Sequence, residues 1–291
     1  MIARLAVIGV GLIGGSLARA LRAAGAVGEV VGAGRGTPNL IEAQSLGIVD
    51  RWTTDPAAAV AGADMVVIGA SLGATAGIFA SIAPALGPAT IVTDVGSTKG
   101  SVVTEARALL GTHLARFVPG HPIAGTEHSG ARAAFAELFT GHKVILTPLA
   151  ETDRAATAGV RAMWELAGAT VVEMDVAAHD DALAATSHLP HLLAFNLVDT
   201  LAAADGAAAI FEFAAGGFRD FTRIASSNPE MWRDIVLANR DALRAVSTRY
   251  IERLERLLAA IERGDGAAIE QCFRRAKAAR DGAQLPTANG R

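Results

Sequence analysis

The chain has 291 residues, of which 51% are hydrophobic and 19% charged, and its formal net charge is −3. This length favours two domains over one, and the composition is typical of a folded protein with a large core. The 26 basic and 29 acidic residues include no basic tract, so nucleic acid is not an expected partner.

The single cysteine, Cys272, cannot form an internal disulfide, which fits a reducing cytoplasm. The segment 65–93 carries no charged residue and is long enough to cross a bilayer. Glycines and prolines interrupt it, so we interpret it as two short buried strands with a helix between them. We therefore expect a cytoplasmic protein without a membrane span.

Compact runs of valine and isoleucine alternate with helical segments through the first half of the chain. Such runs indicate strands buried on both faces, as in a parallel sheet covered by helices. We expect strands over 4–10, 29–34, 64–70, 89–95, 115–122, 142–148 and 169–175. The alternation predicts an α/β fold with a doubly wound, Rossmann-like sheet.

The pattern changes after Asp175, because no further β-rich run follows and helical patterns continue to about residue 280. We expect a dinucleotide-binding domain over 1–176 and an all-α domain over 177–291, with a flexible tail after about residue 282. A helical domain of this size could fold alone, so burial by itself does not require a dimer.

The first motif is GVGLIG, residues 9–14, which follows the first strand and opens a helix. This is the context that a dinucleotide-binding turn requires. In such a turn Gly9 makes the tight bend, Gly11 lets the backbone approach a pyrophosphate, and Gly14 lets the helix pack close to the strand. The helix N-terminus then faces the phosphates, and we assign Leu12 and Ile13 to the same site.

The second strand ends at Gly34, where dinucleotide-binding folds commonly carry an acidic residue for the adenosine ribose, and Arg35 follows. Arg35 is either a solvated loop residue or the partner of a 2′-phosphate. The cofactor is NADP or NAD, and we favour NADP. Ser71 and Asp94 are assigned to the same cofactor site.

A histidine precedes a proline in GHPIAGTEHSG, residues 120–130. Pro122 favours an extended backbone at His121, which helps to fix the direction of the side chain. The position follows a strand at the carboxyl edge of the sheet, where open α/β folds bind ligands. A histidine is suited to take a proton near neutral pH. His121 is thus either a solvated loop residue or a catalytic one.

Five segments together resemble the prephenate/arogenate dehydrogenase family of tyrosine biosynthesis. They are GVGLIGGSLARAL (9–21), DVGSTKG (94–100), GHPIAGTEHSG (120–130), SHLPH (187–191) and GGFRDFTRIASSNPEMWRD (216–234). The resemblance implies oxidative decarboxylation of prephenate, arogenate or both, with hydride transfer to NAD(P), giving 4-hydroxyphenylpyruvate or tyrosine. It also implies a homodimer that pairs through the C-terminal helices.

The resemblance makes His121 the catalytic hydrogen-bond partner of the C4 hydroxyl of the substrate. It places Ser97 in hydrogen bonds with both His121 and that hydroxyl. Lys99, in the same segment as Ser97, is plausible as a surface charge, and no role is assigned to it. The pocket residues that the resemblance implies are Thr126, Glu127, His188 and His191.

His188 and His191 are three residues apart and face the same side of a helix. A metal site would need at least a third ligand, and only Asp180 and Asp181 are near in the sequence. We therefore expect no metal.

The segment 216–234 is rich in charged and aromatic residues. The spacing of Asp220 and Arg223 lets them meet on one helix face, which would be either a surface ion pair or a substrate site. In the second case Arg223 binds a substrate carboxylate and Asp220 positions it. Trp232 either lines the pocket or packs in the core, and Arg219 is assigned to the substrate side chain.

Two alternative functions stay open. One is another NAD(P)-dependent hydroxyacid dehydrogenase with a helical second domain. Such families usually carry a lysine with a following polar residue on the first interdomain helix, where this chain has HLPHLLAFN. The other is a non-catalytic NADPH-binding sensor, and the set of His121, Ser97 and Arg223 argues against it. The choice between prephenate and arogenate is also open.

Overall fold

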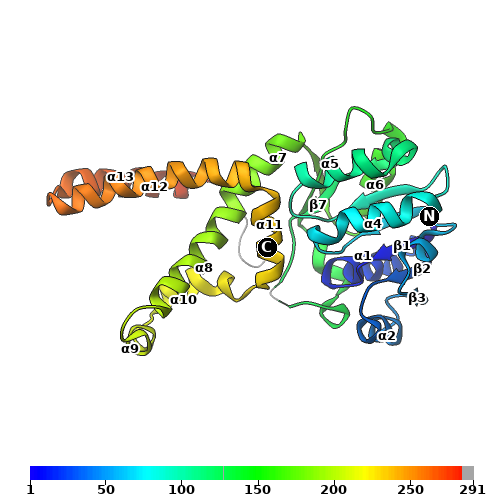
Figure 1. The fold of residues 1–291 in the computed structure, drawn as a ribbon, viewed down its shortest axis with the longest axis horizontal. Coiled ribbons are helices and arrows are strands. Elements are labelled where there is room, and N and C mark those ends of the chain that lie inside the picture. The colour runs from blue at the N-terminus through cyan, green and yellow to red at the C-terminus, as the bar shows by residue number, and fades with distance from the viewer. Residues whose placement is uncertain (127, 284–291) are drawn as a thin grey trace.

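The computed structural model describes residues 1–126 and 128–283. The tail that was expected to be flexible lies outside the described residues from position 284 onward, and so does Glu127. Strands and helices alternate through the first part of the chain, and only helices follow the last strand (Figure 1). The first of these later helices, α7, begins at Val176.

A six-stranded parallel sheet forms the centre of the first half, in the order β3-β2-β1-β4-β5-β6. This is the strand order of a dinucleotide-binding doubly wound fold, so the predicted fold class is confirmed. The edge strand β3 was not predicted, because three residues are too few to show a pattern. The strands are β1 (Ile2–Ile8), β2 (Val27–Ala33), β3 (Arg51–Thr53), β4 (Met65–Ile68), β5 (Ile91–Asp94) and β6 (Phe117–Val118).

Helices cover both faces of this sheet, and each face has its own apolar cluster. Leu5 and Val7 of β1 belong to one cluster, and Ala6 and Ile8 belong to the other, because successive strand residues point to opposite faces. The helices of this half are α1 (Leu12–Ala23), α2 (Thr37–Ser45), α3 (Pro56–Val60), α4 (Thr75–Ile82), α5 (Gly100–Leu109) and α6 (Arg154–Leu166).

The predicted strand 115–122 is divided in two. After β6, the chain forms β7 (Gly120–Pro122), which pairs antiparallel with β8 (Lys143–Leu146), and β8 pairs parallel with β9 (Thr170–Glu173). Pro119 lies at the break and has no N–H group to continue the ladder of the first sheet. His121 therefore lies in a strand, within the predicted range, but this strand belongs to a second, small sheet and not to the parallel one.

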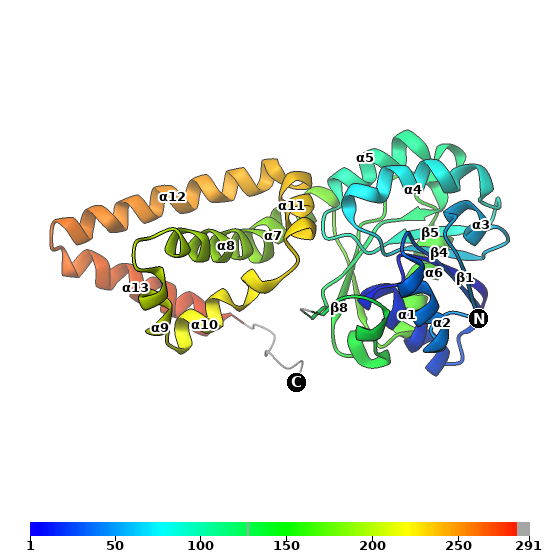
Figure 2. The same cartoon turned by 60° about the horizontal axis from the view of Figure 1, so that its bottom comes forward.

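The second half is helical, as predicted, and its last two helices run together away from the sheets (Figures 1 and 2). Among the described residues, neither apolar cluster includes a position beyond Ala169. The helices are α7 (Val176–Leu183), α8 (Leu189–Ala202), α9 (Ala207–Glu212), α10 (Gly216–Thr222), α11 (Pro229–Ala238), α12 (Arg240–Glu262) and α13 (Gly266–Gly282), with a π-helical turn at Ala184–His188.

Candidate active site

The glycine motif forms the turn between β1 and α1, beside the carboxyl ends of β1 and β4. Gly9 has a φ of +91°, and a Cβ atom there would lie 2.6 Å from the backbone of Gly69. A Cβ atom on Gly14 would lie 2.7 Å from the carbonyl oxygen of Gly9, whereas one on Gly11 would meet nothing within 4 Å. The fold therefore requires glycine at positions 9 and 14, and the space over Gly11 fits the approach of a phosphate.

Leu12 is buried and Ile13 is packed against the core, so both side chains point inward. What they offer to a ligand is the backbone at the N-terminus of α1, where unpaired N–H groups favour anions.

A groove runs from the glycine turn to the end of β2. The side-chain amide of Asn39 donates to the Val10 carbonyl and accepts from the Ala131 N–H, so its orientation at the groove is fixed. Arg35 is exposed, and within the described residues its guanidinium has no partner. The groove is lined by Gly9, Val10, Gly11, Gly34, Arg35, Gly36, Asn39, Leu40, Gly69 and Gly130.

Arg35 also borders a second groove, which contains Ser71 and reaches α11. This groove connects the end of the sheet to the helical half. Its lining residues are Arg35, Ser71, Gly73, Ala74, Asn228, Glu230, Met231, Arg233 and Asp234.

Lys99 and Asp94 form a buried ion pair at the end of β5. Lys99 Nζ lies 2.5 Å from Asp94 Oδ2 and donates to the Gly120 carbonyl oxygen at 2.7 Å. Burial lowers the pKa of Lys99, and the charge of Asp94 opposes that shift. The interpretation of Lys99 as a surface charge is therefore wrong. The Asp94 carboxylate also accepts the N–H groups of Gly96 and Gly120, so it faces the protein interior and not the cofactor groove.

His121 lies at the middle of β7 and is only 8% exposed. Its Nδ1 atom lies 2.9 Å from Nε2 of His179. Within the described residues its Nε2 atom has no hydrogen-bond partner, yet it is not sealed from solvent. Burial lowers the pKa of His121 well below its usual range, and the charge of Lys99 adds to the shift. The imidazole is therefore neutral at physiological pH, and its Nε2 atom is open to a ligand.

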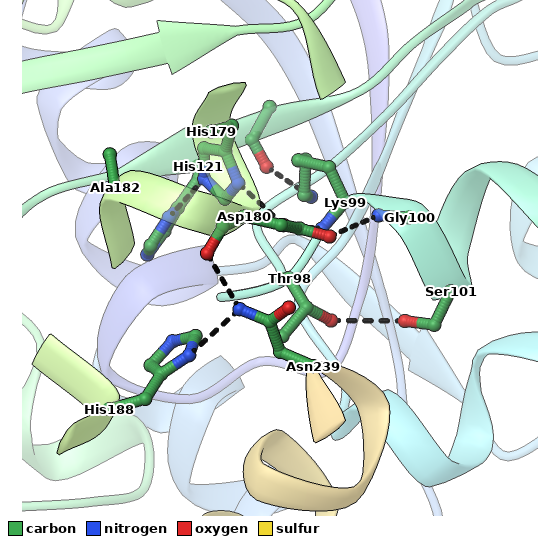
Figure 3. Close-up of polar contacts among 12 residues, drawn as sticks. Thr98, Lys99, Gly100, Ser101, His121, His179, Asp180, Ala182, His188 and Asn239 are labelled. Carbon is green, nitrogen blue, oxygen red and sulfur yellow. Dashed lines mark hydrogen bonds and ion pairs between the residues drawn. The ribbon is translucent and has the colours of Figure 1, made fainter. Parts of the chain in front are cut away.

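Asp180 connects His179 to the beginning of α5. His179 Nδ1 lies 2.8 Å from Asp180 Oδ1, and the same carboxylate accepts the backbone N–H groups of Lys99 and Gly100, each at 2.8 Å (Figure 3). Burial would raise the pKa of the Asp180 carboxyl, but the hydrogen bonds from His179 and from the two backbone groups outweigh it and lower this pKa. Asp180 is therefore an ionised group at the positive end of a helix.

His188 ends the π-helical turn and is fully buried. The side-chain amide of Asn239 donates to the Asp180 carbonyl oxygen at 2.8 Å and to His188 Nδ1 at 3.1 Å (Figure 3). Burial lowers the pKa of His188 to about 4. His188 thus lies in the interior, and Asn239 connects it to the hydrogen-bond network of His121, His179 and Asp180.

His191 and Trp232 stack on each other, with ring centroids 3.6 Å apart and an interplanar angle of 20°. Burial lowers the pKa of His191, the backbone of Ser187 opposes this shift, and the charge of Arg223 adds to it. The positive charge of Arg223 therefore disfavours protonation of His191. An apolar pocket beside this pair is lined by Leu192, Phe195, Pro229, Trp232, Arg233 and Val236.

The predicted contact between Asp220 and Arg223 is not present. α10 ends at Thr222, and Arg223 begins a 3₁₀ turn, so the geometry of one α-helix does not extend to Arg223. Asp220 instead lies 4.0 Å from Arg219, and their side chains are 82% and 81% exposed.

Two further predicted residues make no hydrogen bond to His121 among the described residues, although the backbone of Ser97 opposes the shift by which burial lowers the pKa of His188. Ser97 is partly buried, and within the described residues no hydrogen bond joins it to His121, whose Nδ1 is paired with His179. Thr126 is exposed, and its hydroxyl accepts the backbone N–H of His128 at 3.2 Å. Glu127 is outside the part of the chain that the structure describes.

His179 and Asn239 were not predicted, and Asp180 was considered only as a metal ligand. His179 and Asp180 are adjacent and contact each other, but their other partners and those of Asn239 are 51 to 81 positions away in the chain, so no spacing rule connects them. The one available signal was the HDD sequence at 179–181, at the start of the helical half.

Within the described residues, no three histidine, cysteine, aspartate or glutamate side chains lie together in a group that could hold a metal ion. In the same part of the chain no helix has the length and apolar character to cross a membrane.

The parallel sheet, its glycine turn and the buried histidine at its carboxyl edge define a nucleotide-dependent oxidoreductase with a helical second half. Two family models match the chain: "Prephenate dehydrogenase, nucleotide-binding domain" over residues 17–173 and "Prephenate dehydrogenase, dimerization domain" over residues 175–275. The chain belongs to the prephenate dehydrogenase family.

Known proteins agree with this assignment over nearly the full chain. The cyclohexadienyl dehydrogenase of Zymomonas mobilis subsp. mobilis is 39% identical, over 95% of this chain and 94% of that protein. The prephenate dehydrogenase of Aquifex aeolicus, solved with hydroxyphenyl propionate and NAD+, has 36% identity and a TM-score of 0.90, covering 96% of this chain and 98% of that one. The Synechocystis arogenate dehydrogenase has 29% identity and a TM-score of 0.80, covering 96% and 99%.

Proposed function

We propose that the chain catalyses the NAD(P)-dependent oxidative decarboxylation of prephenate, arogenate or both. The observation that carries this proposal is the neutral, buried His121 at the carboxyl edge of the sheet, in a chain of the prephenate dehydrogenase family. Cyclohexadienyl, prephenate and arogenate dehydrogenases among its relatives support the substrate class.

The reaction needs one proton acceptor. Nicotinamide, when bound, accepts the hydride from C4 of the substrate ring. The hydroxyl on that carbon loses its proton, and we assign this proton to Nε2 of His121, since that atom is an unpaired imidazole nitrogen that solvent can reach. Loss of CO2 then makes the ring aromatic, and the electron pair of the broken bond reaches the ring oxygen, which recovers a proton.

Cations are needed for the carboxylates of the substrate. We assign one carboxylate to Arg223, whose planar donors can bind it with two hydrogen bonds and whose charge already acts on His191. The stacked pair of His191 and Trp232 then forms one wall of the substrate site. The further members that we propose for this site are Ser97, Thr126, Glu127, Arg219 and Asp220, whereas His188 is fully buried and contacts Asn239 behind the site.

For the cofactor we favour NADP over NAD. Arg35 is exposed and unpaired among the described residues, at the point where two grooves meet. The preceding position, Gly34, carries no carboxylate to accept from a ribose hydroxyl or to repel a phosphate.

We propose a homodimer that pairs through the C-terminal helices. Ile251, Leu254, Leu258 and Ile261 of α12 are between 40% and 54% exposed. The helical half lies outside both apolar clusters, so its helices need another surface to cover these side chains. Sedimentation at micromolar concentration should give twice the chain mass, and Leu258→Asp should shift the protein toward the monomer, whereas the exposed control Glu255→Gln should not. A monomeric wild type would contradict the proposal.

The activity test mixes the protein with prephenate or arogenate and with NADP or NAD, and follows the absorbance of the reduced nicotinamide. We expect reduction with at least one of the four pairs, together with release of CO2 in equal amount. Reduction without CO2 would favour another hydroxyacid dehydrogenase. Binding of cofactor without any reduction would favour a sensor.

A further inference from the structure

We propose that His179 is a positioning residue that holds His121 in the tautomer with its proton on Nδ1, and that Asp180 fixes His179 in turn. Nε2 of His121 is thereby kept as a hydrogen-bond acceptor. The proposal rests on the proposed function only for the identity of the hydroxyl that Nε2 meets.

The Asp180 carboxylate determines which ring nitrogen of each histidine carries the proton. An ionised carboxylate accepts hydrogen bonds and cannot donate one. Asp180 uses both oxygens on backbone N–H groups, and Oδ1 also lies 2.8 Å from His179 Nδ1. The proton of a neutral His179 therefore lies on Nδ1, because the other tautomer would turn a lone pair toward the carboxylate.

The tautomer of His179 in turn determines the tautomer of His121. A neutral imidazole with its proton on Nδ1 has a lone pair on Nε2. This Nε2 atom lies 2.9 Å from His121 Nδ1, so His121 must donate there. The second nitrogen of His121 then has a lone pair, and this is the nitrogen that solvent, and hence a substrate, can reach.

Burial and the charge of Lys99 keep the His121 ring neutral before turnover, which leaves the lone pair on Nε2. The titratable groups that act on its ring are Lys99, His179 from α7 and His188 from the π-helical turn. When Nε2 takes the substrate proton, His121 becomes a cation and still donates through Nδ1 to His179. The ionised Asp180 accepts on the far side of the His179 ring, so this chain of hydrogen bonds ends on a carboxylate. No second proton transfer is needed.

The chain of contacts crosses between the two halves of the molecule (Figure 3). His121 belongs to β7, His179 and Asp180 belong to α7, and the N–H groups that hold Asp180 open α5. The direction of the catalytic imidazole is therefore set by the contact of the helical half with the sheet half.

Kinetics can separate positioning from a structural role. His179→Phe keeps the ring volume but removes the acceptor, whereas the amide oxygen of His179→Gln can still accept from His121 Nδ1. Removing a general base costs roughly a hundred- to ten-thousand-fold, and a residue that acts through it should cost less. We expect His179→Phe to lower kcat by about ten- to a hundred-fold with little change in KM, and His179→Gln to restore much of the loss.

A double-mutant cycle gives the decisive comparison. If His179 acts only through His121, then His179→Phe should cost nothing further in a His121→Asn background. An equal loss in both backgrounds would mean that His179 only maintains the fold, and would overturn the proposal. So would a His179→Phe variant with normal kcat. Thermal unfolding followed by circular dichroism identifies any variant that is not folded.

A second readout needs no turnover. Long-range proton–nitrogen NMR correlations of histidine-labelled protein report the tautomer of each ring, with His121→Asn and His179→Phe providing the assignments. We expect the Nδ1–H tautomer for His121 in the wild type and its loss in His179→Phe. A wild-type Nε2–H tautomer would overturn the proposal even if the protein oxidises prephenate. The expected tautomer in a protein that oxidises neither substrate would leave the positioning role standing and overturn the proposed function.

Discussion

Lys99 and Asp94 form an ion pair that is sealed from solvent: their charged atoms are 2.5 Å apart, and their side chains are 0% and 3% exposed. The same ammonium group donates to the carbonyl of Gly120, the residue before His121. Lys99 thus joins the end of β5 to β7, the short strand that carries the proposed base His121. A lysine that looked like a surface charge is one of the groups that set the geometry of the site.

Replacement of Lys99 by methionine should destabilise the protein strongly. The substitution keeps much of the side-chain volume but leaves the Asp94 carboxylate buried without its cation, and breaking a buried pair costs about 3–5 kcal/mol. Urea unfolding should show this loss in the free energy of unfolding. Lys143→Met, at an exposed lysine, is the matched control and should stay within about 0.5 kcal/mol of the wild type. Equal stabilities for the two variants would contradict the role of the buried pair.

Stability should also depend on His188 at acidic pH. Its pKa is about 4 in the folded protein and near 6.5 when unfolded, so the unfolded state binds the proton first as the pH falls. The contribution of His188 is therefore complete above pH 6.5 and is lost progressively between 6.5 and about 4. His188→Gln should make the free energy of unfolding depend less steeply on pH in that window. An unchanged slope would show that His188 is not the group responsible.

The pH dependence of catalysis tests the state of His121. A base must be unprotonated to act, and burial, with the charge of Lys99, lowers the pKa of His121 well below 6.5. The value of kcat/KM should therefore stay constant as the pH falls through 6.5, and it should decrease only at a lower pH, where His121 becomes protonated. An acidic limb at or above 6.5 in a protein that is still folded would argue against His121 as the base.

The fold could be predicted from the sequence because its signals are local. The valine and isoleucine runs and the glycine turn each fix a short piece of backbone, and together they define the doubly wound sheet. The break at Pro119 and the edge strand β3 were missed, because strand pairing depends on neighbours that are distant in the chain. Lys99 was misjudged for the same reason, since nothing near it in the sequence shows that Asp94 and Gly120 enclose it.

The site was predictable only in part. His121 could be found from its proline and its place after a strand, but its partner His179 comes from a helix 58 positions later. The expected contact of Asp220 with Arg223 failed because a helix end lies between them. Residue spacing predicts contacts within one continuous helix, whereas the histidine network depends on how two halves of the molecule meet.

Cofactor choice should respond to the two residues after β2. Arg35→Ala should raise the KM for NADP much more than the KM for NAD, because only NADP carries the 2′-phosphate. Gly34→Asp should shift the preference toward NAD. A Cβ atom at Gly34 would come no closer than 3.6 Å to Leu40, so a side chain can begin there without a clash at its Cβ atom. Steady-state kinetics with both cofactors measure these effects, and equal changes for the two cofactors would reject the role of Arg35.

The final prediction separates chemistry from binding in the substrate site. Loss of the hydride makes the substrate hydroxyl more acidic, so its hydrogen bond to Nε2 of His121 strengthens in the transition state, and His121→Asn should lower kcat by roughly a hundred- to ten-thousand-fold with little change in KM. Arg223 binds a carboxylate that is charged throughout the reaction. A charge-assisted hydrogen bond contributes about 1.5–3 kcal/mol, so Arg223→Ala should raise the KM for prephenate by about ten- to a hundred-fold, with a smaller effect on kcat.

Arg219→Ala is the control for Arg223, since Arg219 carries the same charge on an exposed side chain four positions earlier. We assign it to the substrate side chain and not to the ring carboxylate, so its loss should raise KM less than the loss of Arg223 does, and by different factors for prephenate and arogenate. Those two substrates differ only in that side chain, which is a keto acid in one and an amino acid in the other. Normal kcat in His121→Asn, or unchanged KM in Arg223→Ala, would show that the corresponding assignment is wrong.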